Sequence, residues 1–364
     1  FSDTFAGIVG YYIGKKKYYI GSYYKTYSGS FAFFISSLIV IFLSFYFFFS
    51  IPLSLSFWGA YMISAYLTLI EGISIWGLDN FLVPISAYII MERFVQAPFD
   101  YGFMMTQGII SIGIISYIAY RFRLLSFSGI LASAILGIAV FYFGDWRWFL
   151  PLLFFFLSGS LFSFLGKEKK NIALALEDIS PRTGKQVFSN CGPVFVLLIF
   201  YSYTQDSIFL YAYLSLIAAM TADTWASEIG ILTDIQPFKI TNFQMSVHGV
   251  SGAISFLGLS AALVGAGAVG GFLFLWHSAS FQILALIILS AWIAQLVDSY
   301  LGALLQAKYL CGKCGLYIEK SIHCGQKAKK ISGFSWLDNN MVNFISSGFA
   351  AVFTLFVLNF FPIQ

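Results

Sequence analysis

Two short stretches of this chain follow one pattern, Asp-Thr-aromatic-Ala-x-x-(Ile/Val)-Gly. The first, DTFAGIVG, begins at Asp3, and the second, DTWASEIG, begins at Asp223. On a helix the Asp, Ala and Gly positions of this pattern share one face. Each copy would therefore present one carboxylate beside two small residues, and a ligand or a neighbouring backbone could approach it closely.

A carboxylate at the end of an apolar segment, followed by basic and small residues, suits Mg²⁺ bound together with nucleotide phosphates. Mg²⁺ typically takes one or two carboxylates plus phosphate oxygens, while Lys side chains and backbone N–H groups hold the remaining phosphate charge. The segments 25–30 and 239–252 contain Lys, Gly and Ser residues of this kind. We interpret Asp3 and Asp223 as the shared chemical groups. Glu228 has no acidic partner in the first copy and belongs to the second alone.

Several other chemistries lack their sequence signatures. The chain contains no GxxxxGK[ST] loop, no GxSxG elbow and no HExxH pair, so P-loop, serine-hydrolase and zincin mechanisms are unsupported. The alternative for the two Asp residues is a simple helix-capping role. Their duplication beside basic loops favours a functional role.

The composition indicates a membrane protein. The 364 residues are 59% hydrophobic and 10% charged, whereas soluble domains carry about 25% charged residues. Stretches near the roughly 20 apolar residues that cross a bilayer predict an all-α polytopic transmembrane bundle of about 10–11 helices. The stretches near this length are 31–50, 57–76, 104–120, 125–143, 148–165, 250–275, 281–303 and 341–361, and shorter or polar-interrupted candidates lie at 81–97, 190–203 and 207–222.

The basic residues predict the orientation of the chain. They gather in loops that fall on one side when the intervening spans are counted, and basic loops stay in the cytoplasm. We therefore expect an integral protein of the cell membrane with its motif loops on the cytoplasmic side. The net charge of +4 reflects this orientation, and we expect no nucleic-acid partner.

The motif belongs to a longer internal repeat. The offset that aligns Asp3 with Asp223 also pairs Gly29 with Gly249, and LDNFLVPIS (78–86) resembles LDNNMVNFIS (337–346). Ordered matches of this kind indicate a duplication. The chain opens directly on the first motif, without spans equivalent to those before the second. We therefore expect an N-terminally truncated or processed product.

These residues resemble two families. FSDTFAGIVGYYIGKKKYY, KTYSGSFAFF and EGISIWGLDNFLVP resemble the C-terminal half of the phytol kinase and dolichol kinase family, which are CTP-dependent membrane kinases. From about residue 105 onward, LSFSGILASAILG, FFFLSGSLFSFLGKEKK, RTGKQVFSNCG, TADTWASEIG and VDSYLGALLQAKY resemble the transmembrane protein 19-like family that includes the plant phytyl-phosphate kinase. The resemblance implies two domains, 1–104 and 105–364.

The resemblance also implies the activity. The second domain would phosphorylate an isoprenyl (phytyl or geranylgeranyl) monophosphate to the diphosphate with CTP and Mg²⁺, and the first would be part of an isoprenoid-alcohol kinase. The implied catalytic residues are Asp3, Asp223, Glu228 and Lys239, with Asp298 as a further Mg²⁺ ligand. The implied nucleotide or phosphate contacts are Lys25, Gly29, Lys167, Arg182, Asn190 and Gly249. His248, beside the Gly-Val-Ser-Gly segment, is another candidate for phosphate contact, with a helix-end role as its alternative.

Two other functions remain open at the level of sequence. A cytidylyltransferase that makes a CDP-lipid would use the same metal and nucleotide chemistry. A transporter would explain the duplicated helices and the Gly-rich run 258–271. Against transport, the polar motifs cluster on one side of the membrane rather than at its middle.

Two further features suggest sites. Cys311, Cys314, His323 and Cys324 offer the four soft ligands of a structural Zn²⁺; reduced thiols that shape a loop and a redox pair are the alternatives. Glu71 lies inside an apolar run, where a carboxylate is costly. We expect it to pair with a lysine or to line a headgroup site in the first domain.

Overall fold

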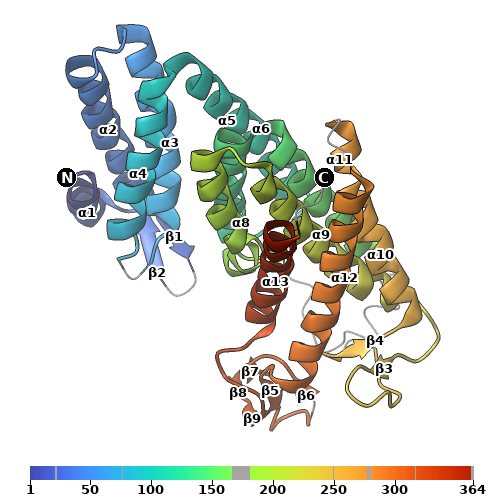
Figure 1. Ribbon diagram of the computed structural model, residues 1–364. Coiled ribbons are helices and arrows are strands. Elements are labelled where there is room, and N and C mark those ends of the chain that lie inside the picture. The colour runs from blue at the N-terminus through green and yellow to red at the C-terminus, as the bar shows by residue number, and fades with distance from the viewer. Residues whose placement is uncertain are drawn as a thin grey trace. The chain divides into compact units, whose positions relative to one another are not determined.

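The computed structural model describes residues 1–20, 23–75, 77–165, 181–248, 250–276, 280–315 and 317–361 (Figure 1). Within these ranges, nine helices are long and apolar enough to cross a membrane, which confirms the polytopic all-α bundle. One of them, α6 (Phe127–Phe164), contains both stretches predicted at 125–143 and 148–165. Asp145, with φ 61° and ψ −161°, interrupts the helix between them. The stretch predicted at 81–97 is helical too, as α4 (Asp79–Gln96), but is not among the nine.

The chain packs into two units, which we describe separately. The first comprises Phe1–Asp145 and Pro181–Val187, and the second comprises Trp146–Ser180 and Phe188–Gln364. The predicted boundary near residue 104 was drawn from family resemblance rather than packing, and it stays a prediction. Two helices, α6 and α8 (Gly184–Thr204), have residues in both units.

The first unit otherwise consists of four long helices, one shorter helix and a hairpin. Its elements are α1 (Ser2–Ile13), β1 (Lys17–Ile20), β2 (Tyr23–Thr26), α2 (Tyr27–Leu43) continued by a π-helical turn (Ser44–Phe48), α3 (Leu53–Ile73), α4 and α5 (Pro98–Arg121). Strands β1 and β2 are antiparallel, with Lys17 opposite Thr26.

The second unit is built around α9. Its elements are α9 (Ser207–Gly230), β3 (Phe238–Lys239), β4 (Ala253–Ile254), α10 (Phe256–Gly270), α11 (Phe272–Leu275), α12 (Phe281–Leu304), β5 (Lys308–Leu310), β6 (Tyr317–Ile318), β7 (Ile322–His323), β8 (Gln326–Lys327), β9 (Lys329–Ser332) and α13 (Asn339–Phe360). Buried hydroxyls join three of its helices, since Thr354 Oγ1 lies 2.7 Å from Ser215 Oγ and 3.0 Å from Ser290 Oγ. Such contacts hold apolar helices together in a membrane.

The duplicated motif forms the same block in both units: a helix, an antiparallel hairpin and a second helix. In the first unit the block is α1–β1–β2–α2, and in the second it is α9–β3–β4–α10. Thr26 caps α2 by accepting a hydrogen bond from the Gly29 N–H at 3.1 Å. Ser255 caps α10 by accepting one from the Gly258 N–H, also at 3.1 Å. Hydroxyl caps of this type fix where a helix begins.

The small residues of the motif let the two helices of each block touch. A Cβ added at Gly29 would lie 3.0 Å from the Ala6 carbonyl oxygen and 3.4 Å from Gly10 Cα. A Cβ added at Gly258 would lie 2.9 Å from the Ala226 carbonyl oxygen and 3.5 Å from Gly230 Cα. The Ala and Gly positions of the motif are therefore helix-packing positions in both copies.

This geometry corrects the ungapped alignment of the repeat. The residue that packs as Gly29 does is Gly258, in Ser255-x-x-Gly258, and not Gly249, which lies outside the described residues. The loop that joins β3 to β4 is much longer than the loop that joins β1 to β2, and the extra residues shift the register. The LDN match is confirmed in position, because Asp79 is the first residue of α4 and Asp338 is the N-cap of α13.

The segment between α12 and α13 contains short strands that accompany the all-α bundle. Its strands form a three-stranded sheet in the order β6-β5-β9 and a separate hairpin, β7-β8. Figure 1 shows these strands gathered at the ends of α12 and α13. We call residues 305–337 the β-module.

We predict that Gly258→Ala destabilises the protein by about 1–3 kcal/mol, the usual cost of overpacking. Its methyl group would press on backbone of α9. Gly267→Ala, in the same helix, is the matched control, since its Cβ would meet nothing closer than Ile288 Cδ1 at 3.9 Å and Ala is the better helix former. Thermal unfolding in detergent measures both variants. Equal melting temperatures would show that the helix contact is not tight.

Candidate functional site

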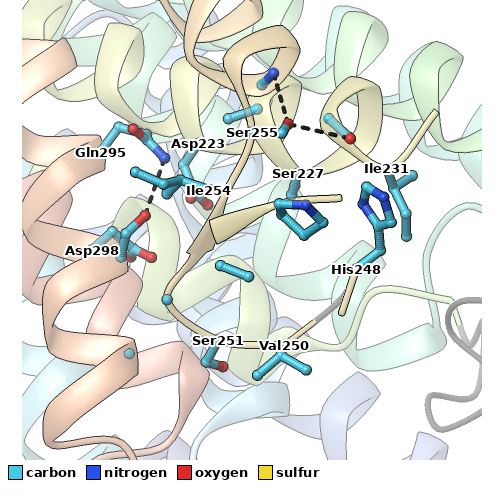
Figure 2. Close-up of a pocket in the computed structure, with 18 of the residues that line it drawn as sticks. Asp223, Ser227, Ile231, His248, Val250, Ser251, Ile254, Ser255, Gln295 and Asp298 are labelled. Carbon is cyan, nitrogen blue, oxygen red and sulfur yellow. Dashed lines mark hydrogen bonds between the residues drawn. The ribbon is translucent and has the colours of Figure 1, made fainter. Parts of the chain in front are cut away.

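A cavity of about 330 Å³ opens in the second unit beside the C-terminal third of α9 (Figure 2). Its walls come from α9, the segment 248–255, the start of α10, α12, the β-module and the first residue of α13. Cavities that bind small ligands are typically about 300–1,000 Å³. The volume thus suits a small polar group.

The cavity is acidic. Four carboxylates line it, from Asp223, Glu228, Asp298 and Glu319, and His248 is the one basic side chain among the described lining residues. Figure 2 shows Asp223 and Asp298 on the same side of the cavity, on neighbouring helices. Carboxylates gathered where water is restricted repel one another, and a bound cation relieves that repulsion.

Polar side chains of α13 and α8 hold Asp298 in place. Ser346 Oγ donates to Asp298 Oδ2 at 3.0 Å. The amide of Asn343 lies 3.3 Å from Asp298 Oδ2 and 3.3 Å from Asn190 Oδ1. Asn190 also lines a second cavity, of about 20 Å³, which Asp223 shares. Asn190 thus contacts Asn343, whose amide in turn lies beside Asp298.

Glu319 reaches the cavity from the β-module. It accepts hydrogen bonds from Ser251 Oγ and from Gln306 Nε2, the latter at 2.6 Å. Ser251 belongs to the segment that lies directly on α12, where Gly252 has φ +82° and a Cβ would meet Ala303 Cβ at 2.4 Å. Only glycine permits both this backbone conformation and this contact.

Four of the sequence-predicted residues meet in this cavity, namely Asp223, Glu228, His248 and Asp298. Lys239 does not line it. It is exposed on β3, opposite Ala253. Burial lowers the pKa of Lys308. The negative charge of Glu319 opposes this lowering of the pKa, and repulsion by Lys239 adds to it. Glu319, which lines the cavity, and Lys239 thus both act electrostatically on Lys308.

Three other predicted residues are not placed at the cavity. Lys167 and Gly249 lie outside the described residues. Arg182 belongs to the first unit, where its N–H donates to the Leu124 carbonyl and its own carbonyl accepts from the Ser126 N–H. Phosphate contacts by these three residues stay predictions.

The first unit contains a counterpart of the acidic site. Carboxylate oxygens of Asp3, Glu71 and Asp79 lie within 4.8 Å of one another. Lys25 Nζ donates to Glu71 Oε1 at 2.6 Å and to Asp79 Oδ2 at 3.2 Å. The expected lysine partner of Glu71 is thus confirmed. Gly29 is buried against α1 and its N–H donates to Thr26 Oγ1, so its phosphate contact stays a prediction.

The two sites differ in one position. Thr26 and Ser255 are equivalent caps, so Lys25 in the first unit corresponds to Ile254 in the second. Figure 2 shows Ile254 beside Asp223. The first unit therefore neutralises its carboxylates with a lysine of its own, whereas the second has an aliphatic side chain at that place.

The four predicted zinc ligands converge in the β-module. One ligand atom each of Cys311, Cys314, His323 and Cys324 lies within 4.8 Å of the others. A backbone hydrogen bond from Cys314 and a side-chain hydrogen bond from His323 lower the pKa of the Cys311 thiol to about 6. A thiolate is the form that binds metal.

The sequence-based prediction missed several lining residues, chiefly Glu319, Gln306, Gln295, Ser251 and Ser255. One signal for Ser255 was present in the sequence. Thr26-x-x-Gly29 and Ser255-x-x-Gly258 both have a hydroxyl residue three positions before a glycine, which is typical of the start of a helix. Glu319 had no comparable signal. It lies between two zinc-ligand candidates, far along the chain from the motif.

Comparison with known proteins gives one family. The family model described as integral membrane protein DUF92 matches residues 110–351. Protein PGR of Arabidopsis thaliana is 30% identical over 271 residues, which cover 67% of this chain and 92% of that protein.

Two microbial relatives are similar as well. Uncharacterized membrane protein MJ0933 of Methanocaldococcus jannaschii is 32% identical over 201 residues, covering 55% of this chain and 83% of the relative. Uncharacterized membrane protein sll0875 of Synechocystis is 27% identical over 179 residues, covering 48% and 69%. No solved structure shows a significant match.

We predict that Lys25→Met destabilises the first unit by up to about 3–5 kcal/mol, the cost of leaving a buried charge without its partner. Glu71 is largely buried and has Asp79 nearby. Adding Glu71→Gln to Lys25→Met should recover much of the loss, since the amide carries no charge. Melting temperatures in detergent test both variants. A double variant no more stable than Lys25→Met would contradict the ion-pair role.

We predict that Ile254→Lys weakens Mn²⁺ binding at the cavity at least tenfold, about 1.4 kcal/mol. The new ammonium group would take the place that Lys25 holds in the first unit and neutralise Asp223. Ile254→Met, of similar length without the charge, is the control and should bind Mn²⁺ as the wild type does. Electron paramagnetic resonance of free Mn²⁺ measures the affinity. Equal affinity in both variants would dismiss the correspondence of Lys25 and Ile254.

Proposed function

The chain belongs to the integral membrane protein DUF92 family, and from its acidic cavity we propose a membrane-embedded phosphotransferase. The substrate would be an isoprenyl monophosphate, phytyl or geranylgeranyl, and the product its diphosphate. CTP is the proposed phosphoryl donor and Mg²⁺ the proposed metal.

One observation carries the proposal: carboxylates from three separate segments converge on one cavity at the ends of apolar helices. Asp223 comes from α9, Asp298 from α12 and Glu319 from the β-module. The described lining residues include no Lys or Arg that would balance them. Mg²⁺ with nucleotide phosphates requires this kind of acidic, partly open pocket.

The residues have separate tasks in such a transfer. We assign Mg²⁺ binding to Asp223 and Asp298; the metal would supply positive charge for the donor phosphates. Lys239 and Lys308, which repel each other electrostatically, would attract the phosphates of donor and acceptor. Positioning and charge neutralisation account for most of the catalysis of phosphoryl transfer.

The bond changes are simple. An oxygen of the isoprenyl monophosphate attacks the γ-phosphorus of the donor and forms a new P–O bond. The bond between the γ-phosphorus and its bridging oxygen breaks, and the nucleoside diphosphate leaves with that oxygen. The acceptor oxygen is already ionised near neutral pH, so the step has no need of a strong general base.

The surroundings of the cavity suit a lipid substrate. The loop between β3 and β4 carries Phe243, Met245 and Val247, each more than 70% exposed, and leads into His248 of the cavity wall. Leu257 at the start of α10 is also exposed. Exposed apolar side chains next to a polar cavity favour an amphipathic ligand with its headgroup inside.

The side of the membrane and the role of the first unit complete the proposal. CTP is cytosolic, so we place the cavity on the cytoplasmic side, as the distribution of basic residues predicts. We propose that the first unit is related to an isoprenoid-alcohol kinase, with Asp3 as its carboxylate. Because Lys25 already occupies its acidic cluster, we assign transfer to the monophosphate to the second unit.

We predict that Asp223→Asn lowers isoprenyl diphosphate formation below a tenth of the wild-type rate, because the amide removes a charge that holds the metal. The assay uses purified protein in detergent, Mg²⁺, CTP labelled at the γ-phosphate, and phytyl or geranylgeranyl monophosphate. Asp206→Asn, at the N-cap of the same helix, is the control. It should keep full activity, since Asn caps as well as Asp.

The released nucleotide separates the alternatives. A kinase yields labelled diphosphate and CDP, whereas a cytidylyltransferase yields labelled pyrophosphate and a CDP-lipid. Turnover of no nucleotide across several donors and acceptors would overturn the phosphotransferase and favour transport. Activity retained in Asp223→Asn would overturn the role of Asp223.

A further inference from the structure

The β-module has a very small core. Among the described residues, its hydrophobic cluster consists of the buried side chains of Ala307, Tyr309, Cys311 and Ile318, with Ala328 packed against them. Segments below about 40 residues rarely hold their fold without a disulfide, a metal or a partner. None of the four cysteines forms a disulfide. The module therefore needs another source of order.

Two tight turns bring the four candidate ligands together. In the first, the Gly315 N–H donates to the Cys311 carbonyl at 2.9 Å, and Gly315 has φ 72°. In the second, which joins β7 to β8, Gly325 has φ 77° and Cys324 itself has φ 50°. A two-residue hairpin turn of the I′ type has positive φ at both central positions, and this conformation is costly for a residue with a side chain such as Cys324.

The second turn places two adjacent residues on the same centre. His323 Nδ1 lies 3.3 Å from Cys324 Sγ and 3.5 Å from Cys314 Sγ. Backbone N–H groups of Lys313 and Cys314 are directed at Cys311 Sγ. Neighbouring residues in an extended strand would point to opposite sides. The strained turn at Cys324 removes that difficulty.

These distances fit a tetrahedral zinc. With Zn–S near 2.3 Å, ligand atoms of a tetrahedral site are about 3.8 Å apart, and the four atoms here lie within 4.8 Å of one another. Three Cys and one His form a common structural zinc set. We propose that Cys311, Cys314, His323 and Cys324 bind one structural Zn²⁺, and that the zinc-bound module holds Glu319 in the cavity.

The link to the cavity follows from the position of Glu319. It lies after β6 and before β7, between the ligands Cys314 and His323 in the chain. Its carboxylate accepts from Ser251 of the cavity wall and from Gln306 at the start of the module. Loss of the metal would release both turns that flank Glu319. The cavity would then lose one of its four carboxylates.

The first experiment is metal analysis of the full chain, purified in detergent without chelator. We expect about one zinc per chain in the wild type and near none in Cys314→Ser or His323→Ala. His323→Cys should keep zinc, because four thiolates also bind it. Cys191→Ala, a buried cysteine outside the module, is the matched control.

Substitution by Co²⁺ provides a second test of the metal site in the folded wild-type protein. Replacing zinc by Co²⁺ should produce a thiolate-to-cobalt charge-transfer band, which Cys191→Ala keeps and Cys314→Ser loses. Absence of both zinc and the cobalt band in the wild type would overturn the site, as would equal zinc in Cys314→Ser. A Cys311–Cys314 disulfide, seen as a loss of two hydrogens by mass spectrometry, would overturn it in favour of redox chemistry.

The positioning of Glu319 by the β-module is tested by Mn²⁺ affinity at the cavity rather than by phosphoryl transfer. This inference and the proposed function can therefore fail separately. Glu319→Gln and Cys314→Ser should each weaken Mn²⁺ binding severalfold, and the double variant should be no weaker than the worse of the two. Residues that act through one another give such non-additive losses. Additive losses would show that the module does not position Glu319.

Removing zinc from the wild-type protein with a chelator is the control for misfolding of the variants. Removing zinc should weaken Mn²⁺ binding, and returning zinc should restore it. Unchanged Mn²⁺ affinity in zinc-free wild type would overturn the link.

Discussion

Carboxylates set into an apolar helix bundle must find positive charge, and the rest of the structure is arranged around that requirement. In the first unit Lys25 supplies the charge within the chain, through its contacts with Glu71 and Asp79. In the second unit Ile254 stands at the corresponding place, and the carboxylates face an open cavity instead. One exchanged side chain thus separates a closed ion pair from an open acidic cavity.

The same packing presents the carboxylate in both copies. Glycine and alanine bring α1 against α2, and α9 against α10, with backbone atoms in near contact. The hairpin between the two helices is thereby fixed beside the Asp that begins the motif. In the second unit the longer hairpin loop adds residues to the wall, including His248 and Ser251. The duplicated block is therefore a scaffold, and its loop is the part that differs.

The β-module adds what the duplicated block lacks. It brings Glu319 to the cavity from a segment that has no counterpart in the motif, and Glu319 attracts Lys308 of the same module. A module with so small a core would gain order from the zinc proposed above. The stability of this module and the composition of the site are thus connected through Gln306 and Glu319.

The sequence by itself determined the membrane class, the helical architecture and the duplication, because hydrophobic length and local motifs are written along the chain. It also indicated that Glu71 would need a lysine. Only the tertiary structure decided that Gly258 rather than Gly249 matches Gly29, that Lys25 corresponds to Ile254, and that Glu319 belongs to the cavity. The physical reason is that these relations depend on loop length and on contacts between distant segments, which local patterns do not encode.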